Sequence, residues 1–166
     1  TTPSFTDPHF HLDKVLSRGH FGAHNFKQAF DHARDVKCRF TVADVEERAC
    51  QSLELAVGHG LGKMRAQVDV DFATGVISME GVLRAKERYK DQIDIQVVAF
   101  PQEGIVSDPE AEKHLREAIR MGAKVIGGLP EFEANEADQH THIETIFILA
   151  EEFDLPRLVL YELRLV

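Results

Sequence analysis

The stretch Ile93–Phe100 reads IDIQVVAF, and a Pro101-Gln102-Glu103-Gly104 turn follows it directly. A short apolar run rich in β-branched residues and bounded by Pro and Gly predicts a buried strand. Parallel α/β sheets collect their functional groups at the carboxyl ends of their strands. The stretch therefore predicts one element of the fold and also an edge of the sheet at which a site can form.

Strand-like and helix-like segments alternate on both sides of this run. Thr41 is a good N-cap for one of the expected helices, and Gly60 is a suitable stop for it. The expected strands are 4–11, 63–70, 93–100, 124–129 and 158–161, and the expected helices are 26–39, 41–59, 76–89, 109–121 and 142–153. Strands separated by helices predict βαβ units and a parallel sheet, so the class is α/β.

The chain length allows two arrangements of these units. The chain has 166 residues, and a complete (β/α)₈ TIM-type barrel typically needs about 250. The pattern is either a compact doubly wound sheet or about the first five βα units of a barrel, and composition does not separate the two. No Pro-, Gly- or Ser-rich linker divides the chain, so we expect a single domain over residues 1–166.

The composition excludes several classes of protein. The chain carries 19 basic and 28 acidic side chains, a net charge of −9, and such a surface repels nucleic-acid backbones. Its apolar runs are far shorter than the roughly 20 residues that span a bilayer, and no basic-then-apolar leader opens it. Cys38 and Cys50 show no metal-binding or redox spacing. We therefore expect a cytoplasmic protein with two free thiols and no membrane or nucleic-acid partner.

The sequence Asp7-Pro8-His9-Phe10-His11-Leu12-Asp13 carries the strongest local signal for chemistry. Residues i and i+2 of a strand point to the same side, so His9 and His11 present two imidazoles together. Neutral imidazole nitrogens are good ligands for zinc and neighbouring divalent metals. The alternative is that both are polar residues at a strand-to-loop junction.

Gln102 and Glu103 carry the second signal, because they follow the clearest strand and lie at the same end of the sheet as the histidines. A side-chain amide there can hydrogen-bond the donor and acceptor edges of a polar heterocycle. The alternative is a Pro/Gly turn whose polar side chains are solvated.

Four stretches together resemble the cytosine deaminase branch of the amidohydrolase superfamily. They are the Asp7–Asp13 motif, KMRAQVDV at 63–70, IDIQVVAFPQEGI at 93–105 and GAKVIGGLPEFE at 122–133. The resemblance runs in order from Phe5 to about Pro156. The pair of histidines is typical of the whole superfamily, whereas AFPQEGI after the third strand is much more specific.

The resemblance implies a (β/α)₈ barrel enzyme that hydrolyses a C–N bond of a small nucleobase-like heterocycle, a cyclic amidine, pyrimidine or triazine. It implies one divalent metal, zinc or iron, that activates a water molecule. On matching positions, His9 and His11 are metal ligands and Gln102 contacts the substrate ring. The remaining metal ligands and the proton-transfer groups of the family follow later strands, so no catalytic residue is assigned here.

Three departures from the family pattern stand out. The second strand reads Ala66-Gln67-Val68-Asp69 where the family commonly has Thr-His-Val-Asp, and Glu131 stands where cytosine deaminase itself has His. After Pro156 the family's His-x-x-Glu is absent, which suggests a truncation or a frameshift. The alternative function is therefore an inactive half-barrel that works through association. Because a partial barrel exposes sheet edges, we expect a homo-oligomer.

Other histidines carry weaker signals. His20 and His24 lie in a glycine-containing loop that could border a pocket or be solvated. His140 and His142 repeat the spacing of His9 and His11, but they lie at the expected start of a helix, where i and i+2 do not share a face. We interpret them as polar residues of a helix start.

Overall fold

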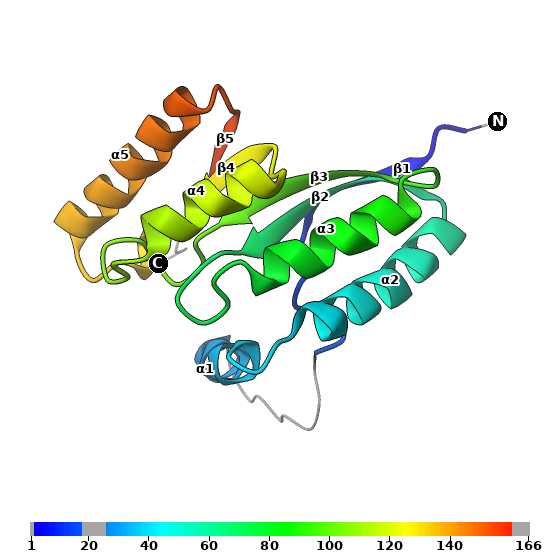
Figure 1. The fold of residues 1–166 in the computed structure, drawn as a ribbon, viewed down its shortest axis with the longest axis horizontal. Coiled ribbons are helices and arrows are strands. Elements are labelled where there is room, and N and C mark those ends of the chain that lie inside the picture. Colours follow the sequence, from blue (N-terminus) through cyan, green and yellow to red (C-terminus); the bar gives the residue numbers. More distant parts are fainter. Residues whose placement is uncertain (1, 18–25, 161–166) are drawn as a thin grey trace.

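The computed structural model describes residues 2–17 and 26–160, and it confirms the alternating α/β pattern (Figure 1). The strands are β1 (Phe5–Phe10), β2 (Leu61–Asp69), β3 (Asp94–Phe100), β4 (Val125–Gly128) and β5 (Arg157–Val159). The helices are α1 (Phe26–Lys37), α2 (Val42–Gly58), α3 (Ile77–Tyr89), α4 (Ala111–Met121), the short 3₁₀ turn η1 (Pro130–Phe132) and α5 (Glu136–Glu152).

The order of the strands decides between the two predicted arrangements. The sheet runs β1-β2-β3-β4-β5 with every neighbouring pair parallel. A doubly wound sheet reverses its strand order and carries helices on both faces, whereas α2, α3, α4 and α5 all lie on one side of this sheet (Figure 1). The described chain is therefore a curled half-barrel of the (β/α)₈ type.

The register of the central strands places the site. β2 and β3 pair without a break from Lys63 opposite Asp94 to Asp69 opposite Phe100. Asp69 and the turn that contains Gln102 therefore leave the sheet at the same end. The pairing of β1 with β2 is irregular between Asp7 and Phe10, and this is the stretch that carries the histidine pair.

The two faces of the sheet have separate apolar clusters. Side chains such as Ile95 and Val97 pack against the helices in the main core, whereas Val98 and Phe100 point to the other face with Val125 and Leu129. This alternation is expected for a strand buried on both sides.

Gly127 in β4 shows how tightly the inner face is packed. A Cβ atom on Gly127 would lie 2.7 Å from Phe100 and 2.9 Å from Val98. Both distances are shorter than van der Waals contact, so the bulky side chains of β3 require a glycine on the neighbouring strand.

Side-chain N-caps determine where two of the helices begin. The Thr41 side chain accepts a 3.2 Å hydrogen bond from the Asp44 amide, as predicted for the start of α2. The last helix begins at Glu136, earlier than the predicted start at His142, because the Asn135 side chain accepts from the Asp138 amide and caps it there. The interpretation of His140 and His142 as helix-start residues is therefore wrong, because both lie inside α5.

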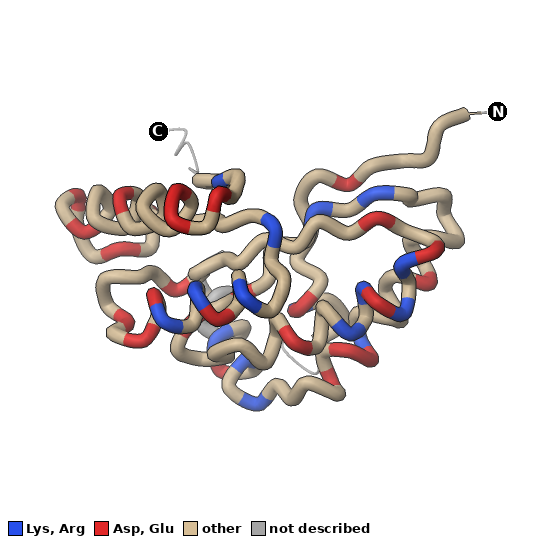
Figure 2. The backbone as a smooth tube through the Cα atoms, turned by 45° about the horizontal axis from the view of Figure 1, so that its top comes forward, with Lys and Arg blue, Asp and Glu red and all other residues tan. Residues whose placement is uncertain are grey.

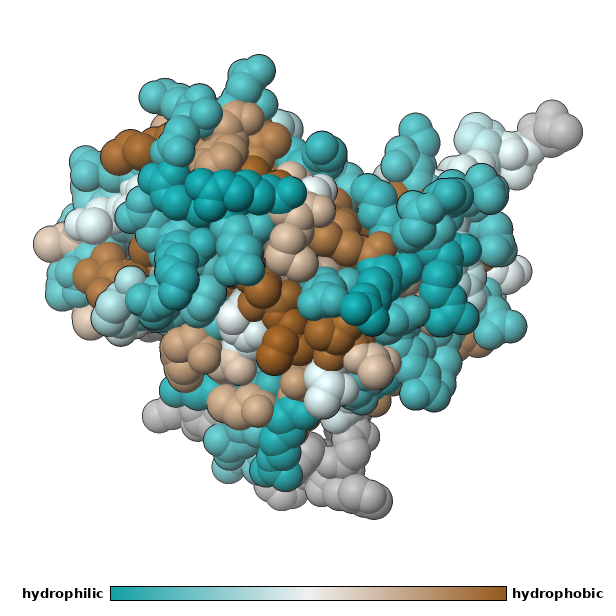
Figure 3. All heavy atoms as spheres, viewed as in Figure 1, coloured by the Kyte–Doolittle hydropathy of each residue, from teal (hydrophilic) through white to brown (hydrophobic). Residues whose placement is uncertain are grey.

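Acidic and basic residues are interspersed along most helices, whereas the charged residues of α5 are all acidic (Figure 2). The apolar patches on the helix-covered face are interrupted by hydrophilic side chains (Figure 3). Within the part of the chain that the structure describes, no helix is both long and apolar enough to cross a membrane.

Candidate active site

Polar side chains gather at the carboxyl ends of β1, β2 and β3, together with two cationic side chains from α1. The group consists of His9, His11, Asp13, Lys14, Arg34, Lys37, Gln67, Asp69, Asp71, Gln102 and Glu103. It is largely buried, and hydrogen bonds and ion pairs link its charged members and Gln102.

The two histidines of the motif lie side by side. The ring centroids of His9 and His11 are 5.3 Å apart in an edge-to-face arrangement. Burial, with the positive charge of Lys14, lowers the pKa of His11 to about 3, so this imidazole is neutral at physiological pH and keeps a lone pair. Its Nδ1 atom is buried and has no hydrogen-bond partner among the described residues.

Gln67 supports this histidine pair from the neighbouring strand. Its side chain is fully buried, and its Oε1 accepts a 3.0 Å hydrogen bond from the backbone N–H of Phe10. Phe10 lies between the two histidines where the β1–β2 ladder is irregular. Gln67, which stands where the family commonly has histidine, therefore ties the Asp7–Asp13 motif to β2.

His11, Asp13 and Asp69 offer ligand atoms that all lie within 4.8 Å of one another. Asp13 accepts a 3.1 Å hydrogen bond from the Asp69 amide through Oδ2, and its Oδ1 is buried without a partner in the described structure. Burial raises the pKa of Asp13 to about 6, although Lys14 lowers it. Asp69 is different, because Lys14 and Lys37 already engage its two oxygens. The donor atoms of His11 and Asp13 fit a divalent cation, whereas both carboxylate oxygens of Asp69 already bind ammonium groups.

Lys37 connects α1 to the ends of two strands. Its Nζ lies 2.8 Å from carboxylate oxygens of Asp69, Asp71 and Glu103, and its side chain is 1% exposed. Burial alone would lower the pKa of Lys37, but these three carboxylates raise it above its usual value. Lys37 is therefore charged and neutralises a buried acidic cluster.

Gln102 and Glu103 are buried rather than solvated. Gln102 Oε1 accepts a 3.2 Å hydrogen bond from Lys14, and Glu103 accepts from Lys37 at 2.8 Å and from Arg34 at 2.6 Å. The alternative of a solvated Pro/Gly turn is wrong, because the cationic side chains of other segments cover it. Sequence reasoning missed these three cations, although Lys14 directly follows the histidine motif.

Glu133 and His142 form a second buried pair beside the turn after β3. His142 Nδ1 lies 2.7 Å from Glu133 Oε1, which also accepts a 2.6 Å hydrogen bond from the Ile105 amide. Burial lowers the pKa of His142 although Glu133 opposes this, so the neutral imidazole donates to the carboxylate. A Cβ on Gly128 would lie 2.6 Å from His142 Nε2, so glycine at the end of β4 makes room for the ring.

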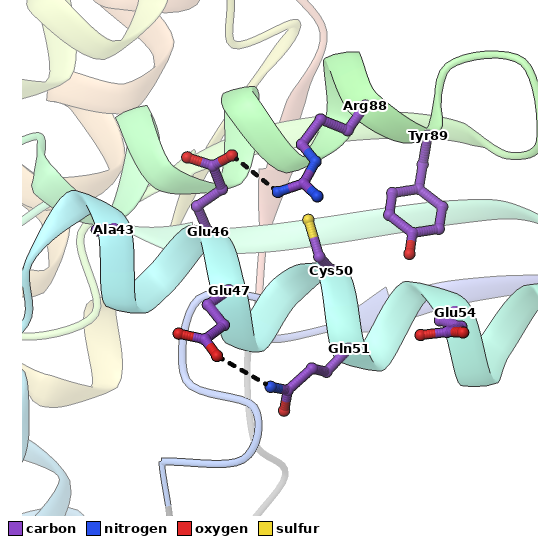
Figure 4. Close-up of a pocket in the computed structure, with 8 residues that line it drawn as sticks. All are labelled: Ala43, Glu46, Glu47, Cys50, Gln51, Glu54, Arg88 and Tyr89. Carbon is purple, nitrogen blue, oxygen red and sulfur yellow. Dashed lines mark hydrogen bonds and ion pairs between the residues drawn. The ribbon is translucent and has the colours of Figure 1, made fainter.

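A groove of about 430 Å³ lies elsewhere, in the helix layer between α2 and α3 (Figure 4). Its lining residues are Ala43, Glu46, Glu47, Cys50, Gln51, Glu54, Arg88 and Tyr89. Burial raises the pKa of the Cys50 thiol, although Arg88 opposes this. The groove contains none of the predicted site residues.

Comparison with known proteins gives a consistent set of relatives. No family model matches the sequence. N-isopropylammelide isopropyl amidohydrolase of Pseudomonas sp. (strain ADP) is 32% identical over 161 residues, which cover 93% of this chain and 40% of that protein. Pterin deaminase of Rhizobium rhizogenes is 33% identical over 76% of this chain and 30% of its own length.

Solved structures agree with the sequence relatives. The 5-methylcytosine deaminase of Klebsiella pneumoniae, liganded with 5-fluorocytosine, superposes with a TM-score of 0.88 at 30% identity, over 95% of this chain and 38% of its own. The chain is homologous to enzymes of the amidohydrolase family. N-isopropylammelide isopropylaminohydrolase of Burkholderia multivorans also superposes, with a TM-score of 0.83 at 28% identity over 96% of this chain and 41% of that one.

This amidohydrolase homologue spans about 40% or less of the curated relatives named here. The structure brings His9, His11 and Gln102 to one end of the sheet. Lys14 bonds to both Gln102 and Asp69, and Asp69 lies near His11. Glu131 lies half-buried in η1, after β4. His20, His24 and residues 161–166 lie outside the described residues, and so does most of the tail after Pro156.

Proposed function

We propose that this chain contributes to a metal-dependent hydrolase that cleaves a C–N bond of a small nitrogen heterocycle, as its relatives' names describe for ammelide, pterin and methylcytosine compounds. The observation that carries the proposal is the adjacent pair of imidazoles, His9 and His11, at the end of β1. The Nδ1 atom of His11 and the Oδ1 atom of Asp13 support it, because both are buried without a hydrogen-bond partner in the described part of the chain.

In this proposal His9 and His11 hold one divalent metal, zinc or iron, and Gln102 contacts the ring of the substrate. The bound metal would supply a water of lowered pKa as the nucleophile. The chain's own contribution is to bury the site, to keep His11 neutral, and to hold Gln102 beside it through Lys14. These arrangements orient a polar heterocycle and limit the access of bulk water.

The metal content of the purified chain tests the proposal. We expect close to one equivalent of zinc or iron per chain after exhaustive dialysis, and its loss when His9 and His11 are both changed to Ala. His59→Ala is the matched control, because His59 is exposed at the end of α2. A double variant that keeps its metal contradicts the site. Ammonia release from cytosine and from cyclic amidines then tests the reaction.

A second candidate function is association without catalysis, and an empty wild-type site favours it. β1 and β5 form the two edges of the described sheet, and Phe5 on β1 is 69% exposed. Exposed edges pair readily with other strands. This candidate predicts a homo-oligomer in sedimentation experiments that Phe5→Lys dissociates. Phe72→Lys is the control, since Phe72 is also exposed but lies outside the strands.

We further propose that residues 1–166 act as one partial-barrel domain in the cytoplasm, with a small molecule rather than a nucleic acid as ligand. The net charge of −9 supports the last point.

A further inference from the structure

The orientation of the Gln102 amide is determined by its neighbour. Lys14 Nζ lies 3.2 Å from Gln102 Oε1. An ammonium group has three hydrogen-bond donors and no acceptor, so only the carbonyl end of the amide can face it. The NH₂ end of Gln102 must therefore point away from Lys14.

Lys14 is itself held firmly enough to impose this orientation. Its Nζ also contacts Asp69 Oδ1 at 2.5 Å, and its side chain is only 19% exposed. Arg48 Nη1 donates to the carbonyl oxygens of Asp13 and Val15, at 2.8 and 2.7 Å, on either side of Lys14. The hydroxyl of Ser17 donates to the Lys14 carbonyl at 2.6 Å. Both ends of this side chain are therefore restrained.

The NH₂ group of the Gln102 side chain remains available to a ligand. Among the residues that the structure describes, none accepts a hydrogen bond from Gln102 Nε2. This atom is not completely buried. A donor that is reachable from solvent and has no protein partner is suited to bind an acceptor atom of a ligand.

We propose that Lys14 is a positioning residue that makes Gln102 a hydrogen-bond donor, so that the site selects ligands with a carbonyl oxygen or an unprotonated ring nitrogen facing Gln102. This inference rests on the proposed function, in which Gln102 contacts the substrate ring. It narrows the substrate class, because heterocycles that present only donors at this point leave the amide nitrogen unpaired. A ligand that covers Gln102 Nε2 without offering an acceptor removes this donor from water and leaves it unpaired, which costs binding free energy.

Nuclear magnetic resonance of the full labelled chain tests the role of Lys14 without any metal or ligand. Gln102→Glu identifies the side-chain signals of Gln102 by removing them. We expect the Gln102 Cδ signal to lie downfield in the wild type, to move upfield in Lys14→Met, and to stay near its wild-type position in Lys14→Arg. Lys63→Met is the matched control, because Lys63 is exposed on β2. An unchanged Cδ signal in folded Lys14→Met overturns the proposal.

Two small probes test the selectivity. The carbonyl oxygen of 2-pyridone accepts a hydrogen bond, whereas the polar groups of benzamidinium only donate. We expect 2-pyridone to shift the Gln102 NH₂ signals and benzamidinium to leave them in place, and the reverse order overturns the proposal. If neither probe binds, the proposed contact of Gln102 with a substrate ring is wrong. The Cδ signal then still shows whether Lys14 orients the Gln102 amide. Thermal unfolding of each variant shows whether it is folded. If Lys14→Met does not fold, the Gln102 Cδ signal in Lys14→Arg tests the proposal instead.

Discussion

The ammonium group of Lys37 and the carboxylate of Asp69 lie 2.8 Å apart with both side chains almost completely buried. Lys37 is the last residue of α1, and Asp69 is the last residue of β2. Burial alone would raise the pKa of Asp69, but Lys14 and Lys37 lower it below its usual value. The pair therefore fixes α1 against the carboxyl end of the sheet, where the candidate site lies.

Lys37→Met should destabilise the protein severely. The variant leaves Asp69, Asp71 and Glu103 buried without their shared cation, and removal of one partner of a buried pair costs about 3–5 kcal/mol. Urea unfolding followed by circular dichroism measures the free energy of unfolding. Lys90→Met is the control, because Lys90 is 57% exposed in its pair with Glu87, and we expect a change below about 1 kcal/mol. Equal effects of the two variants would show that Lys37 has no special role.

Stability should fall in acid partly because of His142. Burial lowers the pKa of His142 from the ordinary 6.5, so the unfolded chain binds this proton first as the pH drops. The contribution of neutral His142 to the free energy of unfolding is complete above about pH 6.5. Below that pH it is lost, by up to about 1.4 kcal/mol per pH unit.

The variant His142→Gln should reduce this pH dependence, because an amide can donate to Glu133 without titrating. The measurement is the difference in unfolding free energy between variant and wild type from pH 7.5 to 5, in which contributions of other groups cancel. His59→Gln on the exposed end of α2 serves as the control. A difference that does not change with pH would argue against the buried neutral imidazole.

Gly127→Ala should destabilise the inner face of the sheet. The added methyl would collide with Phe100 and Val98, and overpacking of a core costs about 1–3 kcal/mol. Gly58→Ala is the matched control, since a Cβ there meets nothing within 4 Å at the end of α2. We expect that control to be neutral or slightly stabilising, because alanine favours helix. Thermal unfolding distinguishes the two, and a stable Gly127→Ala protein would contradict the close packing of β3 and β4.

Glu133→Gln should loosen the turn after β3. Glu133 Oε1 accepts from the amides of Ile105 and Val106, at 2.6 and 3.3 Å. Hydrogen bonds to a charged acceptor contribute about 1.5–3 kcal/mol, so hydrogen exchange at the Ile105 amide should accelerate about tenfold or more. Glu144→Gln, on the exposed side of α5, should leave it unchanged. Unaltered protection of Ile105 in Glu133→Gln would mean that the turn is held by other contacts.

The sequence by itself determined the elements of this fold. The apolar run Asp94–Phe100, the cap at Thr41 and the alternation of strands with helices are local properties, because strand burial, capping and periodicity depend on neighbours along the chain. The histidine pair at His9 and His11 was also readable, since the two-residue period of a strand places both on one side.

The tertiary structure decided what composition and local pattern could not. Strand order separated the half-barrel from a doubly wound sheet, because pairing depends on contacts far apart in the chain. The partners of the site residues came from other segments for the same reason: Lys37 reaches Glu103 across 66 positions, and Lys14 reaches Gln102 across 88. The burial of His142 was not predicted, because it depends on Glu133 and on the space left by Gly128. Charge pairing and close packing in space, rather than sequence spacing, determine the burial and the hydrogen-bond partners of these side chains.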